Sequence, residues 1–457
     1  MALKRSRSNL SGTSFLLIFL FLLIVGGGVA VFFLFFEGDK PTLSFENTPE
    51  FFNTQATVSF SATDRGSGLK TVMLTVKQGD KSYELFRKDF PRERYTNPVG
   101  PLEVTETVNF DPKKAGFTDG KLQLELYGVD FSARNMLAGN AHVLQKTVLL
   151  DTEAPKISLL HTEKYISPGG SGIVIYKMDD SSAKHGLKYN NLFAPGFKLG
   201  DQPDTYIAYF GLPHDTESLD QLSITATDTA GNSNKINFTT NFKRKTKKKD
   251  KINITDGFLS RKIPEFEQSN PGMEGDLLQK FLIVNNRMRI ANNTKIADLC
   301  TTSHPERMWK GRFERMPGSP KADFAEYRSY LYKGKVIDNQ VHLGVDIAST
   351  KHAKIRAANH GIVVFADYLG IYGKTIILDH GQGIFSLYSH LSQFNVSAGD
   401  KVNKGDLVGL TGTSGMAGGD HLHFSMLVHG VFVTPKEWFD GKWIESNIDE
   451  PILNSKF

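Results

Sequence analysis

Histidines carry most of the chemistry that this sequence can offer. Two of them, His421 and His423, stand one residue apart in the stretch GGDHLHF near the C-terminus. In an extended strand alternate side chains share a face, so these two imidazoles would point the same way, about 7 Å apart. Two imidazoles on one face can bind one metal ion, or one can bind while the other transfers protons. Taken alone, the pair is more typical of an ordinary sheet.

A second set of candidates lies earlier, in HLGVD, and contributes His342 and Asp346. Gly344 disfavours a long helix through this segment, so the two side chains must converge through a bend. With one histidine of the HLH pair they make three ligands and leave a fourth position for water. That is the arrangement expected of a catalytic rather than a structural zinc site.

His390, in YSHLS, and the remaining histidine of the pair are candidates for proton transfer, because imidazole titrates near neutral pH. There is no His-Glu-x-x-His motif, so the glutamate base that belongs to it is missing. The only cysteine is Cys300, which excludes an intramolecular disulfide and a cysteine-rich zinc module. Metal ligands must therefore be histidines and carboxylates.

Short strands separated by glycine-rich turns must position these side chains. From residue 336 onward, alternating apolar and polar residues predict a compact β domain. The predicted strands lie in residues 360–367, 374–381, 383–391, 405–412 and 421–430. The three histidine-bearing motifs fall at the boundaries of these elements.

The motifs HLGVD, YSHL and GDHLHF, in this order and at these separations, resemble those of the lysostaphin/LytM-type zinc metallopeptidases. Those enzymes cut peptide bonds in bacterial peptidoglycan. The resemblance places such a domain at residues 312–445 and implies a largely antiparallel β fold with an open groove and one zinc ion. By position, the implied zinc ligands are His342, Asp346 and His423, and the implied catalytic residues are His390 and His421.

The mechanism implied is metal-assisted hydrolysis, in which zinc polarises the carbonyl and lowers the pKa of its water from 15.7 towards about 7. One catalytic histidine would remove the water proton or stabilise the oxyanion, and the other would serve the leaving amine; the sequence leaves this assignment open. The family commonly has glycine and proline where this chain has His352 and Lys354, and glycine where Ala325 stands. These departures affect loop shape rather than ligands. Other histidines are expected at the surface or at strand ends: His352, His360, His380 and His429.

Residues 15–36 form an uncharged apolar run that is long enough to cross a bilayer as a helix. Lys4, Arg5 and Arg7 precede it, so the positive-inside rule leaves residues 1–14 in the cytoplasm and exports the rest. A cleaved signal peptide, with GVA as its small-residue site, is the alternative. The further apolar residues after GVA favour an anchor. We therefore expect a single-pass protein of the bacterial inner membrane with its catalytic domain on the periplasmic side.

Residues 41–242 alternate apolar and polar residues between turn signals, so the chain as a whole is predicted to be mainly β. A faint repeat relates LELYGVDFSARN, which contains Asp130, to LSITATDTAGN, which contains Asp228. It predicts two β-sandwich modules, at 41–152 and 153–242, which resemble the immunoglobulin-like repeats of bacterial surface proteins. We expect them to act as a spacer; binding of wall polymer or a partner is the alternative.

Residues 243–311 are predicted to be a basic linker followed by a helical connecting segment. The run KRKTKKKDK, at 243–251, is typical of a solvated linker, although it could also contact anionic wall polymers or lipid headgroups. The segment 275–291 has helical apolar spacing. The net charge of +5 is modest for this length, so nothing indicates a nucleic-acid partner.

The function expected from these features is that of a membrane-anchored zinc metalloendopeptidase that hydrolyses the peptide cross-links of peptidoglycan. One alternative is an inactive scaffold or activator of other wall hydrolases. Such relatives typically lose ligands, whereas all five functional positions are intact here. A biotinyl- or lipoyl-type carrier, suggested by AGDKVNKGDLVG, is disfavoured because no lysine stands at a hairpin tip and because carriers work in the cytoplasm.

Overall fold

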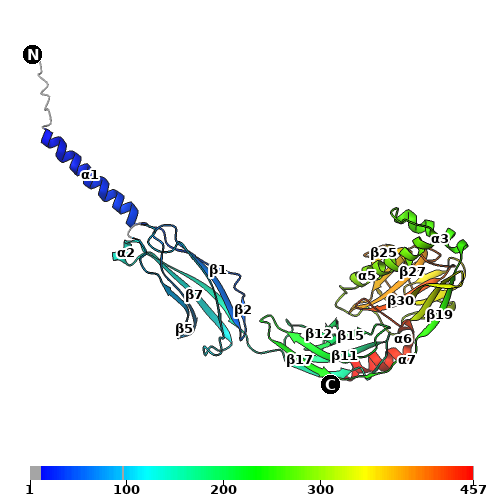
Figure 1. The fold of residues 1–457 in the computed structure, drawn as a ribbon. Coiled ribbons are helices and arrows are strands. Elements are labelled where there is room, and N and C mark those ends of the chain that lie inside the picture. Colours follow the sequence, from blue (N-terminus) through cyan, green and yellow to red (C-terminus); the bar gives the residue numbers. More distant parts are fainter. Residues whose placement is uncertain (1–11, 95–96, 456–457) are drawn as a thin grey trace, which may run out of the picture. The chain divides into compact units, whose positions relative to one another are not determined.

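The computed structural model describes residues 12–94 and 97–455 (Figure 1). They divide into two compact units: Met1–Ala154 with Thr229–Asn232, and Pro155–Asp228 with Ser233–Phe457. Strands hold 43% of the residues and helices 19%, so the predicted mainly-β class is confirmed.

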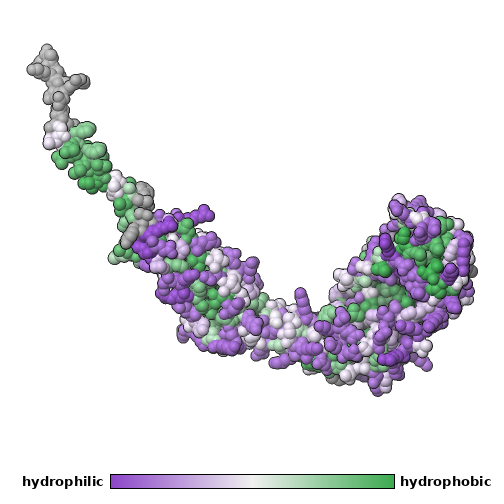
Figure 2. Space-filling view, in the orientation of Figure 1, coloured by the Kyte–Doolittle hydropathy of each residue, from purple (hydrophilic) through white to green (hydrophobic). Residues whose placement is uncertain are grey.

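The N-terminal helix α1, Gly12–Phe35, is apolar along its length and is coloured accordingly in Figure 2. Its residues Gly12–Phe32 form the one helix, among the residues described, that is long and apolar enough to cross a membrane. The predicted apolar helix is therefore present. By length and composition alone, it fits a membrane anchor and a signal sequence equally well.

The remainder of the first unit consists mainly of two sheets that share one hydrophobic core. Their strand orders are β1-β3-β6 and β2-β8-β7-β4-β5. Along β3 every second side chain is buried, including Val58 and Phe60, as expected for a strand with one face on the core. The elements are β1 Thr42–Glu46, β2 Phe51–Phe52, β3 Ala56–Thr63, β4 Leu69–Gln78, β5 Lys81–Asp89, β6 Glu103–Phe110, β7 Gly120–Asp130, α2 Arg134–Leu137 and β8 Ala141–Leu150.

The second module is built from two four-stranded sheets, ordered β14-β15-β11-β9 and β13-β12-β16-β17. Its elements are β9 Ile157–Thr162, β10 Tyr165–Ile166, β11 Ser171–Met178, β12 Lys184–Tyr189, β13 Leu192–Pro195, β14 Phe197–Lys198, β15 Thr205–Gly211, β16 Leu222–Thr227, β17 Ser233–Phe238 and β18 Asn241–Phe242. The immunoglobulin-like character of the two modules stays a prediction.

The strand β11 is buried on both faces, which a free spacer module would not require. Val174 and Tyr176 pack inside the module, whereas Ile173 and Ile175 belong to the core of the C-terminal domain. Trp438 of that domain donates its indole N–H to Ser171 Oγ at 3.1 Å. The second module therefore shares a core with the C-terminal domain and is not a separate domain before it.

The C-terminal domain is organised around a ten-stranded sheet in which β20-β23-β30-β27-β26-β25-β28 are successive neighbours. All five predicted strand segments are strands. The elements are β20 Ser319–Ala322, β23 Val345–Ala348, β24 Lys354–Arg356, β25 Gly361–Tyr368, η2 Gly370–Tyr372, β26 Lys374–Asp379, β27 Ile384–Phe394, β28 Lys401–Val402, β29 Leu407–Thr411, β30 Leu422–Val428 and β31 Val431–Val433.

The predicted basic linker differs from the structure in its second half. Residues Lys248–Ile254 form the strand β19, which pairs in parallel with β21, Glu326–Tyr332; β21 in turn pairs with β22, Lys335–His342. The sequence does not reveal this strand, because its first half is mostly exposed and charged and its partner strand is distant in the chain. The last residue, Ile254, is buried against the helices that follow.

Helices follow β19 over a longer stretch than 275–291 and lie beside β25 and β27 (Figure 1). Apolar side chains of these helices, including Phe266 and Ile296, pack with Phe365 and Leu387 of the sheet, and Cys300 is buried in the same cluster. The elements are α3 Asp256–Ser269, α4 Leu277–Ile283, η1 Val284–Met288 and α5 Arg289–Leu299; at the C-terminus they are α6 Pro435–Phe439, α7 Gly441–Ile444, η3 Glu445–Asp449 and α8 Glu450–Asn454.

Candidate metal centre and catalytic groove

Three of the five candidate residues converge at the junction of β22, β23 and β30. Asp346 and His423 are direct partners across the antiparallel pair β23–β30, so their side chains lie on one face. His342 ends β22, and its Nε2 lies 2.9 Å from His423 Nδ1 and 3.0 Å from Asp346 Oδ1. Asp346 Oδ1 is also 3.0 Å from His423 Nδ1.

Gly344 makes this convergence sterically feasible. A Cβ atom at that position would lie 2.6 Å from the His423 ring. The chain can therefore bend from β22 into β23 only with glycine at this point, and the bend brings His342 back over the β23–β30 pair.

The ring nitrogens that face the cluster are the ones free to bind a metal. His342 donates Nδ1–H to the carbonyl of Asp323 at 2.9 Å, which leaves the lone pair on Nε2. His423 donates Nε2–H to Ser425 Oγ at 3.1 Å, because that hydroxyl itself donates to the carbonyl of Leu343. Such outer hydrogen bonds orient histidine ligands at metal sites. Two imidazoles and a carboxylate fit a zinc ion chemically and in their convergence.

His390 and His421 flank this cluster. His390, on β27, donates Nδ1–H to the carbonyl of Ser414, and His421 donates Nδ1–H to the carbonyl of Gly419, each at 2.8 Å. Both Nε2 atoms are thereby left to face the groove. The His390 and His421 ring centroids are 4.9 Å apart, and His421 Nε2 lies 3.5 Å from Asp346 Oδ1.

His390 also has a strained backbone, with a φ of 64°. Left-handed backbone is unusual for a residue with a Cβ, and such strain concentrates at functional sites. Burial lowers the pKa of His390 well below its usual value, and the neighbouring His421 and His423 lower it further. Burial is the largest single effect on the His421 pKa and lowers it, but the hydrogen bond and charge of Asp346, the carbonyl of Gly419 and the charge of Asp420 together raise it by more, so the net shift is upward. The two flanking imidazoles therefore have different charge preferences.

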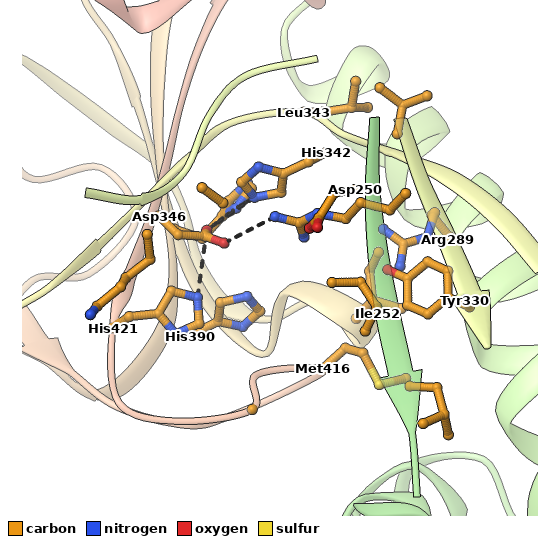
Figure 3. A pocket seen from close by; sticks show the side chains of 18 of the residues that line it. Asp250, Ile252, Arg289, Tyr330, His342, Leu343, Asp346, His390, Met416 and His421 are labelled. Carbon is orange, nitrogen blue, oxygen red and sulfur yellow. Dashed lines mark hydrogen bonds and ion pairs between the residues drawn. The ribbon is translucent and has the colours of Figure 1, made fainter. Parts of the chain in front are cut away.

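The five residues line one cavity of about 410 Å³. Figure 3 shows His342, Asp346, His390 and His421 together on one side of this cavity, while side chains of β19 and β21, such as Ile252 and Tyr330, form the opposite side. The cavity thus lies between the His/Asp/His cluster and the three-stranded sheet.

Sequence reasoning missed two neighbours of the cluster. Arg328 Nη2 lies 3.6 Å from Asp346 Oδ2, and the ring of Tyr372 lies 5.7 Å from that of His423. Arg328 lies on β21, where it pairs with Gln340, two residues before His342 on β22, and only this pairing of distant strands brings it to the cluster.

At the two positions where the family commonly has glycine and this chain does not, the backbone is left-handed. Ala325 has a φ of 60° and His352 a φ of 56°. Glycine is favoured at such positions because it has no Cβ, so the chain tolerates strain in both loops. Ala325 holds its place by donating its N–H to the carbonyl of His342 at 2.8 Å.

The remaining candidate histidines do not reach the cluster. His360 precedes β25, His380 follows β26 and His429 follows β30, so these three lie at strand ends as predicted. His380 is fully buried rather than at the surface; its ring contacts the carbonyl of His360 and Ser386 Oγ.

The class of protein that the fold and the site define is a β-sheet domain with a His/Asp/His cluster of metal-ligand type in a groove. A family model described as Peptidase family M23 matches residues 340–435. The DD-carboxypeptidase/endopeptidase Mpg of Neisseria meningitidis is 33% identical over 96 residues, which cover 21% of this chain and 22% of the relative. Peptidoglycan DD-endopeptidase ShyA of Vibrio cholerae is 33% identical over 89 residues, covering 20% and 21%.

The murein hydrolase activator EnvC of Escherichia coli is 34% identical over 95 residues, covering 21% of this chain and 23% of the relative. Among solved structures, a peptidase M23 from Pseudomonas aeruginosa has 18% identity and a TM-score of 0.39, covering 60% of this chain and 95% of that one. The catalytic domain of lysostaphin from Staphylococcus simulans has 26% identity and a TM-score of 0.24, covering 27% and 92%.

The C-terminal part of this chain is a peptidase M23 domain. Each sequence match spans less than a quarter of the relative's own length.

Proposed function

We propose that this protein is a membrane-anchored zinc metalloendopeptidase that hydrolyses peptide cross-links of bacterial peptidoglycan. The observation that carries the proposal is the convergence of His342 Nε2, Asp346 Oδ1 and His423 Nδ1 within 3.0 Å of one another, with two more imidazoles beside them. The relatives named as peptidoglycan endopeptidases supply the substrate class.

Zinc held by these three residues would supply a Lewis acid and a water of lowered pKa. The protein's own groups do the rest. His390 and His421 present Nε2 to the groove, within reach of a water or of a substrate carbonyl and leaving amine. Ser414 and Gly419 fix the orientation of these rings through their carbonyls. Asp323 and Ser425 do the same for the ligand histidines.

Five single alanine variants test these roles. His342→Ala, Asp346→Ala and His423→Ala should lose bound zinc and activity together. His390→Ala and His421→Ala should retain about one zinc per chain and lose on the order of a hundredfold or more in rate, the usual scale for an acid–base group. Metal analysis beside a turbidity assay on purified peptidoglycan measures both quantities.

Two outcomes would contradict this assignment. If His421→Ala loses zinc while His423→Ala keeps it, the ligand and proton-transfer roles are reversed. If the wild-type protein binds zinc, leaves peptidoglycan intact and instead stimulates a separate wall hydrolase, the second candidate holds: an activator, as its relative EnvC is named.

The anchoring part of the proposal rests on α1 and on the basic residues that precede it. An anchored protein should stay with the membrane fraction at its full length, and protease added to spheroplasts should degrade the C-terminal domain. Release of a chain that lacks α1 would identify a cleaved signal peptide, and protection from protease would refute the topology.

A further inference from the structure

A series of neighbouring hollows leads away from the metal cluster along the junction with the second module. The cavity of the cluster shares Ala322 and Asp346 with a second hollow, which also contacts Asp323 and Lys436. A third hollow shares Asp323 and Lys436 and adds lysines of the run that precedes β19. A fourth continues along the same lysines.

We call the third and fourth hollows the basic groove; the cationic residues that line it are Arg244, Lys245, Lys247, Lys248 and Lys436. The basic groove has a defined shape, because contacts with other residues hold the lysine run in place. Lys248 is the first residue of β19 and pairs in register with Glu326. The Lys247 ammonium lies 4.8 Å from the centroid of the Tyr327 ring, and the Tyr327 hydroxyl lies 3.2 Å from His214 Nδ1 of the second module.

The charges of this groove are only partly balanced within the protein. Lys248 and Lys436 each lie 2.9 Å from the carboxylate of Asp323. In contrast, Arg244, Lys245 and Lys247 form no ion pair within 4.0 Å with any carboxylate in the described part of the chain, although Asp215 and Glu217 line the far end. Three exposed cations without a close ion pair give the groove a positive potential that attracts anions, although Lys245 also acts on Glu437 and lowers its pKa.

We infer that the basic groove binds free carboxylates of the peptide substrate, on the part of the chain that extends from the scissile bond past Asp323 towards the second module. The inference rests on the proposed peptidase function and adds to it the substrate class: a peptide that is anionic on one side of the cut. Continuity with the cavity of the cluster and charge complementarity both support this occupant. Arg244, Lys245 and Lys247 are then specificity-determining residues.

The test compares two synthetic cross-linked peptide dimers, one with free C-terminal carboxylates and one with carboxamides. The full chain in detergent is assayed as wild type, as the triple variant Arg244→Gln/Lys245→Gln/Lys247→Gln, and as a control with three other exposed lysines replaced, Lys188→Gln/Lys335→Gln/Lys401→Gln. Because exposed charge pairs contribute little individually, the wild type should favour the carboxylate peptide over the carboxamide in KM by roughly three- to tenfold. The triple variant should lose this preference and the control should keep it.

Fluorescence anisotropy with the same two peptides, labelled and added to zinc-free protein, separates this inference from the proposed function. In one outcome the wild type binds the carboxylate peptide more tightly, the triple variant loses this difference, and the zinc-loaded wild type cleaves neither peptide. This combination would support the binding role of the basic groove and refute the peptidase activity. Equal KM and equal binding for both peptides in the wild type would overturn the groove and leave the peptidase activity standing. The triple variant could instead keep the preference for the carboxylate peptide but lose the change in KM that phosphatidylglycerol in the micelles causes in the wild type. That result would show that the three cations bind lipid headgroups, and it would overturn the inference.

Discussion

At the scale of single residues, the hydrogen bond donated by one ring nitrogen of each histidine decides whether the other nitrogen is free to bind a metal or transfer a proton. The carbonyl of Asp323 and the hydroxyl of Ser425 accept from the two histidines of the proposed zinc site, and the carbonyls of Ser414 and Gly419 accept from His390 and His421. Three of these acceptors are backbone carbonyls, whose positions no residue type specifies. The five site residues could therefore be named from motifs, whereas their orienting partners required the structure.

The side chain of Glu163 offers a test by pH. It is 6% exposed, its Oε2 has no partner among the described residues, and burial raises its pKa to about 7. Burial likewise raises the pKa of Glu437, on the facing helix α6, to about 7; the charge of Glu163 adds to this effect, while Lys245 opposes it.

The pKa of Glu163 in the folded protein lies above its ordinary value of 4.5, and this determines how stability changes with pH. The stability contributed by protonated Glu163 is fully present below 4.5 and is lost as the pH rises through about 7. Glu163→Gln mimics the protonated form, so it should raise the unfolding free energy by on the order of 1–3 kcal/mol at pH 8 and change it little at pH 4. Urea unfolding at both pH values measures this, with the exposed Glu445→Gln as control. An equal gain at both pH values would contradict a charge-based cause.

At the scale of elements, α3 fixes the loop that orients His390. Glu265 Oε1 accepts from the N–H of Gly415 at 2.6 Å and from the Tyr368 hydroxyl at 3.1 Å. Lys262, buried on the same helix, donates to the carbonyl of Thr413. Ser414, between these two anchored residues, is the one whose carbonyl holds His390.

Removal of this anchor should affect the histidine without affecting the metal. Glu265→Ala leaves a buried N–H and a hydroxyl without their acceptor, which costs about 1–3 kcal/mol of stability. We expect faster amide exchange at residues 413–416 and a lower kcat with zinc content unchanged. Glu274→Ala, on an exposed residue after the same helix, is the matched control. Loss of zinc from Glu265→Ala would show that the anchor supports the ligands instead.

Strand prediction succeeded where burial is periodic and failed where pairing is distant. The five segments of the C-terminal sheet alternate or run apolar, so local pattern was sufficient. Three of the seven residues of β19 are lysines, and its partner strand, β21, lies more than seventy residues away, so no local pattern indicates this pair. The apolar run of β11 signals burial on both faces, but the surface that covers its second face belongs to another domain.

At the scale of the whole molecule, the peptidase domain does not end where its motifs end. Its core includes Ile173 and Ile175 of the second module and Ile444 and Ile448 near the C-terminus. Ser171 donates its N–H to Glu437 Oε2 at 2.9 Å across the same contact. The resemblance places the domain at residues 312–445, and these contacts extend beyond those bounds.

A fragment of residues 155–457 should unfold cooperatively, whereas 312–445 should aggregate or melt well below it. The shorter fragment exposes the apolar faces that β11 and α3–α5 cover, and each fully buried Ile or Phe side chain contributes about 1.5–3 kcal/mol. Differential scanning calorimetry of both fragments measures the difference. Equal melting temperatures would show that the second module is dispensable for stability.

Cys300, the one thiol of the chain, lies in the apolar cluster between α5 and the sheet, where burial raises its pKa. A thiol kept protonated and shielded reacts poorly with oxidants and alkylating agents, so the native protein presents no reactive thiol to its surroundings. A cysteine introduced at any exposed position would therefore be the one site open to a maleimide. Lys335→Cys, for example, would attach a single dye to the peptidase domain with Cys300 left in place.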